Sequence, residues 1–512
     1  MFRRTVTATI LIGGLTTGCT IQPEPLSEAE NLARVVELKN TLADKWAPDS
    51  GEVDLFVAVE QALTRNFEIV AARQALDLQR ATLDDVILGH LPRGHLTGRV
   101  TKRSNPDSSA NSTTASDLKR RLGSAEATWS VLSFGQAYLR SKQQANNVLV
   151  KHEESRRTAN EIVVRAVETY LHAEMAQQLL PDVKGFLADL DKYELRAENY
   201  ATKQLIDPVD VLVFRIRLVN LKKTLRLLRE ELTQRRILLA TLIGSRKTSL
   251  RIKSSGGAVP KVVLSDISLE DLENAALLHR PELHISAYRK RNAALGVKST
   301  YLSLIPDISA AVGANFDSNS ILLNNSYTRF DLSATYNLLN LLRFPARLQV
   351  SKANLTQEEL RELIFAVSVV EQVRLAYADW KRLRRVWKTE RQNAGLWRDV
   401  RKIRSDRTVF EPLDKLRLIE TQASAMSAQV DLAKAQTQYF VGMLRLIQSI
   451  GINLYPAEAL TAGLDPLGRQ LRAHWKMIPR MIESRRQAAG SWRRRSWPAI
   501  PVMVLRLRGL PS

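Results

Sequence analysis

The sequence has few of the residues from which a disulfide-stapled domain or an enzyme site could be built. Its 512 residues include one cysteine, Cys19, so no disulfide can form within the chain. Aromatic residues make up only 6%. No Ser-His-Asp order, paired carboxylates, phosphate-binding glycine loop or zinc-type cysteine spacing stands out. We therefore expect no enzymatic activity and no cofactor.

Histidine is also scarce, and its spacing does not favour a metal site. His90 and His95 are five residues apart, and so are His279 and His284. A separation of five does not place two side chains on one face of a helix. We expect no bound metal ion.

Positive charge is in excess, but it is unevenly distributed. The net charge of +22 would favour nucleic acid or an anionic membrane as partner. Residues 466–512 hold eleven Lys and Arg against one acidic residue, which is about half of the excess. The remainder is interleaved with acidic residues, as on solvated helix faces. We expect no nucleic-acid partner. We interpret the last 22 residues, "SWRRRSWPAIPVMVLRLRGLPS" from Ser491, as a weakly constrained extension, with a membrane-surface segment as the alternative.

The N-terminus predicts export from the cytoplasm. "MFRRTVTATILIGGLTTGCT" has two arginines, a short apolar stretch and small residues before Cys19, which is typical of a signal peptide over 1–18. "LTTGC" resembles a bacterial lipobox, with Leu15 four residues before the cysteine rather than three. We expect Cys19 to be the lipidated (palmitate-bearing) N-terminus; the alternative is an ordinary signal peptide. Thr20 follows Cys19, and this favours the outer membrane as the destination.

The body of the chain contains an internal repeat. "LTRNFEI" begins at Leu63, and "LLHRPEL" begins 214 residues later at Leu277. At the same offset Pro92 matches Pro306, so "GHLP" aligns with "SLIP" without a gap. Each half predicts a helix, two strands, a long helix, a turn and a second helix.

This pattern divides the chain into six parts. After the signal peptide, 19–53 is a lipidated and extended lead. The first repeat spans 54–244, a linker spans 245–268, the second repeat spans 269–451 and the basic extension spans 452–512. The predicted helices lie at 54–90, 136–202, about 211–243, 269–304, 346–404 and about 415–450. The predicted strands lie at 93–103, 121–132, 307–316 and 328–339.

The last helix of each repeat has an apolar residue at alternating intervals of three and four. The first series is Val211, Phe214, Leu218, Leu221, Leu225, Leu228, Leu232, Arg235, Leu239 and Leu242. The second is Leu416, Ile419, Ala423, Met426, Val430, Ala433, Thr437, Phe440, Leu444 and Ile447. Such a seam is typical of coiled-coil packing. The preceding helix, at 136–202, would be about 100 Å long, more than a globular core needs.

The predicted strands alternate apolar and polar residues. In "RFDLSATYNL" Phe330, Leu332, Ala334, Tyr336 and Leu338 alternate with polar residues, and "DISAAVGANF" behaves likewise. About ten residues is the length of a tilted strand that crosses a bilayer. Four strands cannot close a barrel, and open edges are not tolerated in lipid. A membrane location therefore requires several copies of the chain; half-buried strands of a small sandwich are the alternative.

Taken together, these features resemble the TolC-like outer-membrane efflux proteins over about residues 54–451. The resemblance rests on the duplicated order, with "WSVLSFG" echoed by "YNLLNLL", "DPVDVL" echoed by "EPLDKL", and Tyr170 matched by Tyr377. It implies a mainly α protein with membrane β-structure and two tandem structural repeats. Three copies would form a twelve-stranded barrel in the outer membrane, with four strands per chain, and a coiled-coil helical tunnel across the periplasm.

The resemblance also implies partners and a gate. The partners would be a second and third copy of the chain, outer-membrane lipid, a periplasmic adaptor and an inner-membrane pump of the RND or ABC type. The turns between the long helices would close the tunnel, and Asp210 and Asp414 stand at the acidic positions just past these turns. Three copies of Asp414 would then form a carboxylate ring at the narrow pore. Arg417 stands where a second ring acid is expected, and Lys203 and Thr408 replace turn glycines. Either aspartate could instead cap its helix.

We therefore expect a passive exit duct for small molecules in a tripartite efflux system. Two alternatives remain open at this point. One is the duct of a type I protein or polysaccharide secretion system. The other is a periplasmic coiled-coil scaffold lipoprotein without a pore.

Overall fold

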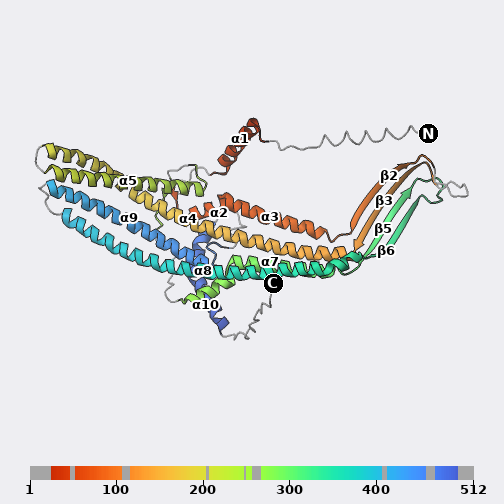
Figure 1. Cartoon of the computed structure of the whole chain (residues 1–512). Coiled ribbons are helices and arrows are strands. Elements are labelled where there is room, and N and C mark those ends of the chain that lie inside the picture. Colours follow the sequence, from red (N-terminus) through yellow and green to blue (C-terminus); the bar gives the residue numbers. More distant parts are fainter. Residues whose placement is uncertain are drawn as a thin grey trace, which may run out of the picture. The chain divides into compact units, whose positions relative to one another are not determined.

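The computed structural model describes residues 25–46, 52–105, 116–202, 207–246, 250–255, 267–405, 412–456 and 467–493. The chain divides into a small N-terminal unit that ends at Asp49 and a large unit from Ser50 onward. Cys19 and the proposed signal peptide lie outside the described residues. Figure 1 shows the elements in chain order.

The N-terminal unit contains a helix where an extended lead was predicted. Helix α1 spans Glu28–Lys45, and Ser27 caps it. The Ser27 hydroxyl accepts from the Glu30 backbone N–H at 3.2 Å, and the Glu30 carboxylate accepts from the Ser27 N–H at 2.8 Å. This reciprocal pair is a capping box. A serine followed three residues later by a glutamate is therefore a signal for the start of a helix. The prediction of an extended lead did not take this signal into account.

The predicted helix over 54–90 is two helices. Helix α2 spans Leu55–Arg65 and α3 spans Phe67–Leu88, with Asn66 between them. The backbone of Asn66 is extended, and its side chain accepts from the Glu68 N–H at 2.8 Å. One residue therefore ends the first helix and caps the second, since a short polar side chain replaces the missing intrahelical bond.

The second half has the same arrangement at the same offset. Helix α6 spans Leu269–His279 and α7 spans Pro281–Leu302, so each boundary lies 214 residues after its counterpart. Here proline causes the break, because the residue before a proline is pushed out of the helical conformation. Arg280 is extended accordingly, and Pro281 begins the next helix.

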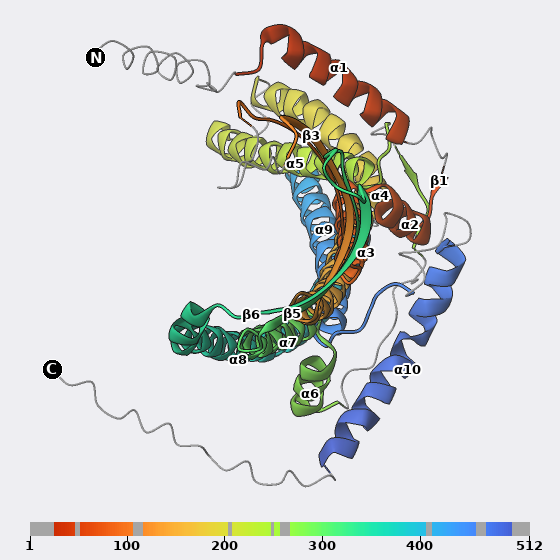
Figure 2. The same cartoon turned by 90° about the vertical axis from the view of Figure 1, so that its right-hand side faces the viewer.

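Four strands form one antiparallel sheet in the order β2-β3-β5-β6. They are β2 (Arg93–Lys102), β3 (Lys119–Ser130), β5 (Asp307–Asp317) and β6 (Ser326–Thr335). Figure 2 shows that the sheet is curved. The final strand ends earlier than predicted, because the Asn337 side chain accepts from the Leu339 N–H and a helix begins at Leu338. Tyr336 and Leu338 are therefore not strand residues.

The sheet continues into two very long helices, each followed by a shorter one. Helix α4 spans Val131–Thr202 without interruption at Pro181, and α8 spans Leu338–Ser405. Helix α5 (Pro208–Leu242) packs along α4, and α9 (Pro412–Ser449) packs along α8. In Figure 1 the sheet lies at one end of these helices, and the C-terminal ends of α4 and α8 lie at the other, with the starts of α5 and α9.

The predicted seams are the buried faces of α5 and α9. Among the α5 positions Phe214, Leu218, Leu225 and Leu232 are buried in a shared cluster, and Ile419 and Val430 join them from α9. The third component, which the heptad pattern did not predict, is the stretch of α4 from Met175 to Leu190. The described seam residues are therefore buried as the heptad pattern predicted. They pack against α4, a helix of the same chain.

The largest core lies midway along the long helices and includes parts of the proposed linker and of the basic extension. Residues 251–252 of the proposed linker form β4, which pairs in parallel with β1 (Glu52–Val53). The Tyr170 side chain, fully buried, donates to the Val53 and Lys253 carbonyls of this pair.

The basic extension contributes to the same core. Helix α10 spans Leu467–Arg493 and packs against α2 and α6. Trp475 is 2% exposed, and its indole N–H donates to the Leu454 carbonyl at 2.8 Å. A line of apolar side chains fixes this helix to the large unit: Leu467, Leu471, Trp475, Ile478 and Ile482. The segment that we interpreted as weakly constrained begins at Ser491, and its residues from 494 onward lie outside the described part of the structure.

Candidate functional site

The sheet has one apolar face, and this face is open in the single chain. Residues opposite each other in an antiparallel pair share a face, and alternate residues along a strand do the same. The register pairs Phe330 with Val312 and Leu332 with Ala310. Leu332 is 71% exposed, Phe330 72% and Leu96 of β2 89%. A sheet that exposes its apolar side in this way is suited to an apolar surrounding.

The opposite face is polar and internally bonded. Arg329 forms ion pairs with Glu126 at 3.3 Å and with Asp331 at 2.5 Å. Ser309 and Ser333 share a hydrogen bond of 2.8 Å across β5 and β6. The expected division of Phe330, Leu332 and Ala334 from Asp331, Ser333 and Thr335 therefore corresponds to the two faces of the strand.

The predicted gate residues lie in the first turns of α5 and α9. Asp210 is the third residue of α5, and Asp414 is the third residue of α9, with Arg417 one turn later. Their side chains lie outside the described part of the structure. The N-cap of α5 is Asp207, whose carboxylate accepts from the Val209 N–H at 2.8 Å. Asp207 is therefore the N-cap of α5.

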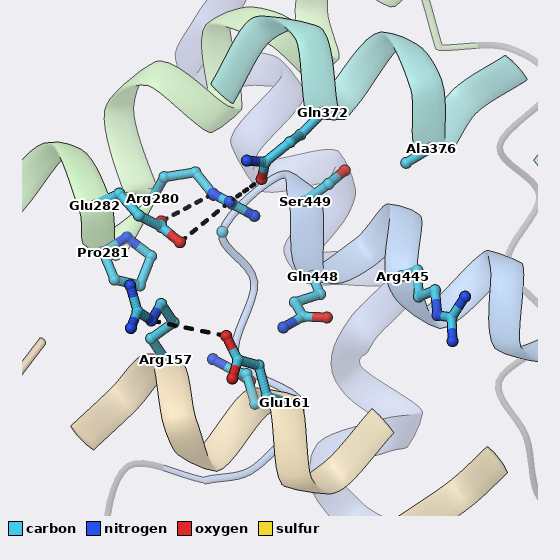
Figure 3. Close-up of a pocket in the computed structure, with 12 residues that line it drawn as sticks. Arg157, Glu161, Arg280, Pro281, Glu282, Gln372, Ala376, Arg445, Gln448 and Ser449 are labelled. Atoms are coloured by element: carbon cyan, nitrogen blue, oxygen red, sulfur yellow. Dashed lines mark hydrogen bonds and ion pairs between the residues drawn. The ribbon is translucent and has the colours of Figure 1, made fainter. Parts of the chain in front are cut away.

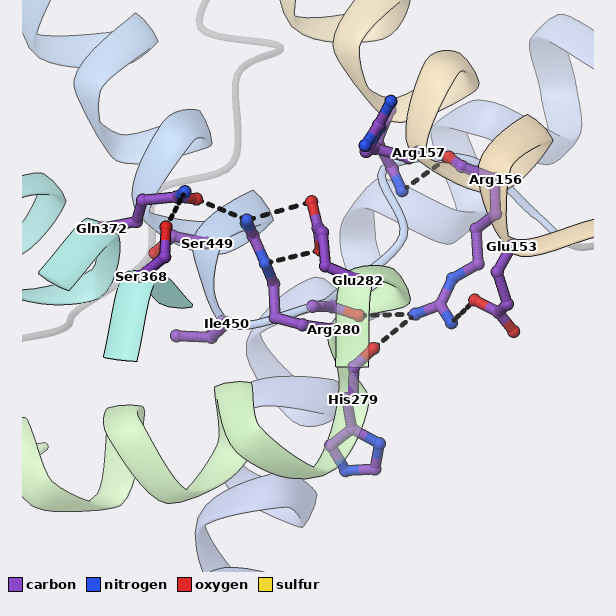
Figure 4. A network of polar contacts seen from close by, with 12 residues as sticks. Glu153, Arg156, Arg157, His279, Arg280, Glu282, Ser368, Gln372, Ser449 and Ile450 are labelled. Carbon is purple, nitrogen blue, oxygen red and sulfur yellow. Dashed lines mark hydrogen bonds and ion pairs between the residues drawn. The ribbon is translucent and has the colours of Figure 1, made fainter. Parts of the chain in front are cut away.

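A polar network joins the two repeats at the level of the main core (Figure 4). Arg156, on α4, donates to the carbonyls of His279 at 3.0 Å and Gly451 at 2.9 Å, which end α6 and follow α9. It also donates to Asn453 at 2.7 Å and pairs with Glu153 at 2.9 Å. One guanidinium therefore satisfies the last carbonyl of α6, where the helix dipole favours a cation, and a carbonyl of the turn that follows α9.

The titratable groups around Arg156 respond to its charge. Burial raises the pKa of the Glu153 carboxyl, but hydrogen bonds with His152 and His284 and the charge of Arg156 outweigh burial, so its pKa lies well below the usual value. Burial and the charges of Arg485 and Arg156 lower the pKa of His279 to about 4. The hydrogen bond with Glu153 raises the pKa of His284. Near neutral pH the cluster therefore holds a carboxylate, guanidinium groups and a neutral His279.

A cavity of about 340 Å³ lies beside this network, between α4, the α6–α7 break, α8 and α9 (Figure 3). Its cations have acidic partners. Arg280 pairs with Glu282 at 3.0 Å, Arg157 with Glu161 at 3.7 Å and Arg445 with Glu168 at 2.9 Å. Because the charges are balanced from within the protein, we interpret the cavity as a polar junction between helices rather than a ligand site.

Two other kinds of feature are absent from the described residues. They contain no group of three or more His, Cys, Asp or Glu side chains that could hold a metal ion. Among the described helices, none combines the length and the apolar character needed to cross a bilayer.

Sequence reasoning missed the Arg156 network. Arg156 stands in a long helix among other charged residues, and its partners lie 123 and 295 positions away in the chain. The sequence signal that could have indicated this junction is the glycine directly after the second heptad helix, Gly451. In the structure its φ is 77°, a conformation that favours glycine. A Cβ there would lie 2.7 Å from the His279 backbone.

No protein-family model matches the sequence, and no curated protein matches it. Solved structures do match. The Campylobacter jejuni CmeC outer-membrane channel has a TM-score of 0.64 and 12% identity over 82% of this chain and 89% of that one. The open state of the Neisseria gonorrhoeae MtrE outer-membrane channel has a TM-score of 0.60 and 16% identity over 78% and 88%. The Vibrio cholerae outer membrane protein VceC has a TM-score of 0.61 and 14% identity over 78% and 96%. The chain therefore has the fold of the TolC-like outer-membrane channels.

Proposed function

We propose that this chain is the subunit of a trimeric outer-membrane channel that serves as the exit duct of a tripartite efflux system. The observation that supports this most strongly is the sheet. Its apolar face is exposed, and its outer strands β2 and β6 have one free edge each within the described chain. Free edges are not tolerated in lipid, so the sheets of three copies would join edge to edge into a closed twelve-stranded barrel.

In this proposal the duct is passive. The long helices of three copies line a tunnel through the periplasm, an inner-membrane pump of the RND or ABC type supplies the energy, and an adaptor connects the pump to the helix turns. Small molecules are the proposed cargo. No catalytic group is required.

Two residue sets complete the proposal. Asp414, and more weakly Asp210, form carboxylate rings near the inner end of the tunnel, with Arg417 partly neutralising the charge. Cys19 is acylated and anchors the mature chain to the outer membrane. Incorporation of labelled palmitate should be lost in Cys19→Ser, and incorporation that persists would exclude Cys19 as the anchor.

The barrel can be tested with single cysteines introduced into the Cys19→Ser protein. Leu332→Cys and Ala334→Cys lie on the apolar face of β6, and Ser333→Cys and Thr335→Cys lie on the polar face. We expect a membrane-impermeant, water-soluble maleimide added to outer-membrane vesicles to label the second pair and spare the first, because lipid covers only the apolar face.

The same experiment separates the channel from a scaffold. In a periplasmic scaffold without a pore, water would reach both faces and all four positions would react. Ion conductance of the purified protein in planar bilayers is the second measurement, and its absence would also exclude a channel. A protein or polysaccharide duct would pass both tests, and export assays with the neighbouring transport genes distinguish that cargo from small molecules.

A further inference from the structure

Three cations gather on the apolar face of the sheet at the end farthest from the long helices. The register places Lys102 of β2 directly opposite Lys119 of β3, and Val100 opposite Arg121. Because faces alternate along a strand, Lys102, Lys119 and Arg121 share a face with Leu96 and Val100. All three side chains are exposed.

Their height on the sheet corresponds to the edge of a membrane. Trp129, 58% exposed, lies on the same face at the helix-proximal end of β3. From Trp129 to Lys119 the strand rises about 34 Å, or about 26 Å along the membrane normal at a tilt of about 40°. Arg121 lies about 5 Å lower, and its long side chain can extend the guanidinium to the same level. Barrels have an apolar band about 25 Å tall between aromatic girdles. The three cations therefore lie where the hydrocarbon of the far leaflet ends and its headgroups begin.

Among the described residues, no acid balances this charge. Asp117 and Asp317 lie at this end of the sheet, and both are engaged elsewhere. Asp317 pairs with Arg120 on the opposite face, and Asp117 accepts from the Ser320 N–H at 2.7 Å. Among the described residues, no ion pair or side-chain hydrogen bond is found for Lys102, Lys119 or Arg121. Like charges directly opposite each other in a sheet are destabilising, so an external anion would stabilise this corner.

We propose that Lys102, Lys119 and Arg121 bind the phosphorylated headgroup of a lipid in the outer leaflet of the outer membrane. Phosphate suits the group, since a guanidinium can bind it bidentately and an ammonium as a point charge. The neighbouring apolar side chains Val100 and Leu96 contact the acyl region below. This inference rests on the proposed channel, because it requires the apolar face to lie in lipid.

The test uses full-length protein in mild detergent, with the diphosphorylated lipid A portion of lipopolysaccharide as probe and bound lipid counted by native mass spectrometry. Lys119→Gln/Arg121→Gln should bind the probe about 25-fold more weakly, about fivefold for each cation removed. The matched control is Arg93→Gln/Arg99→Gln, which removes two cations from the polar face of the same hairpin. Its affinity should stay within about twofold of wild type.

Two further arms identify the ligand. Dephosphorylated lipid A should bind wild type as weakly as lipid A binds the double variant. Inorganic phosphate alone should fail to displace lipid A at millimolar concentration. If removal of the phosphates changes nothing, or if free phosphate competes fully, the proposed recognition of a lipid headgroup is wrong.

A charge-conserving variant distinguishes the loss of charge from a defect in folding. Lys119→Arg/Arg121→Lys should keep near-wild-type binding, and its loss would show that charge is not the determinant. Trimer migration on unheated gels is recorded for each variant. If wild type fails to assemble or insert, the channel itself is refuted. If wild type inserts and the glutamine variant still binds lipid A fully, only the lipid site is refuted.

Discussion

Arg156 connects more parts of the chain than any other side chain described above. It reaches the last carbonyl of α6, a carbonyl of the turn that follows α9, an asparagine of the C-terminal segment and a carboxylate of its own helix. Gly451 allows the turn after α9 to approach the end of α6 closely. Its positive φ suits glycine, and any Cβ would collide with the His279 backbone.

We expect Arg156→Ala to lower the free energy of unfolding by about 3 kcal/mol, because Glu153 loses its cation and two buried carbonyls lose their donor. The measurement is urea unfolding of the detergent-solubilised protein, followed by circular dichroism. Arg157→Ala is the control. Its side chain is 46% exposed and lies 3.7 Å from Glu161, so its loss should cost at most about 1 kcal/mol. Equal effects of the two substitutions would contradict the assigned role of Arg156.

At the scale of elements, α10 shows how a basic segment can be part of a core. Its arginines and lysines are largely on the solvent side, and its apolar residues recur at intervals of three and four toward α2 and α6. The Trp475 ring packs edge-on against Phe56 with centroids 5.4 Å apart. Helix α10 therefore packs against α2, at the start of the first repeat, and stabilises it.

Trp475→Ala should destabilise the protein by about 3–5 kcal/mol, since it leaves a large cavity and an unsatisfied Leu454 carbonyl. Limited proteolysis should then cleave within 467–493 much faster than in wild type. Met477→Ala, at a position 51% exposed on the same helix, is the matched control and should change neither quantity measurably. Protection of α10 in the Trp475 variant would mean that this ring does not hold the helix.

At the scale of the whole molecule, the long helices separate the sheet from the first turns of α5 and α9, which lie at the opposite end of the large unit. In the proposed trimer three copies of each first-turn acid surround the axis. Like charges in a narrow pore create a strong local field, which selects among permeating ions.

Asp414→Asn should therefore lower the preference for cations, measured as the reversal potential across a planar bilayer under a salt gradient. Arg417→Ala removes the partly neutralising cation and should shift the reversal potential in the opposite direction. Asp207→Asn serves as control, because that carboxylate caps its helix and an asparagine can still accept the bond. If neither Asp414→Asn nor Arg417→Ala changes selectivity, Asp414 does not line the pore.

Patterns that repeat over many residues were sufficient to predict the long helices of the two repeats, the strand faces and the seams. Phe214, Leu218 and Leu225 are buried as the heptads indicated, and Phe330 and Leu332 share a face as their alternation indicated. These features follow from local periodicity, which a chain shows without knowledge of its neighbours. The break at Asn66 and the capping box at Ser27 were also encoded locally, in single polar residues whose capping role was overlooked.

Contacts between segments that are distant in the chain could not be predicted from the sequence. Arg156 with Gly451, Tyr170 with the β1–β4 pair, and Trp475 with Phe56 join residues that are far apart in the chain and have no shared period. The same holds for Lys102 and Lys119, which are cross-strand neighbours only because of the register of the β2–β3 hairpin. Local sequence determines which face of an element is apolar. Only the packed structure decides what that face meets, because burial and pairing depend on which elements come together.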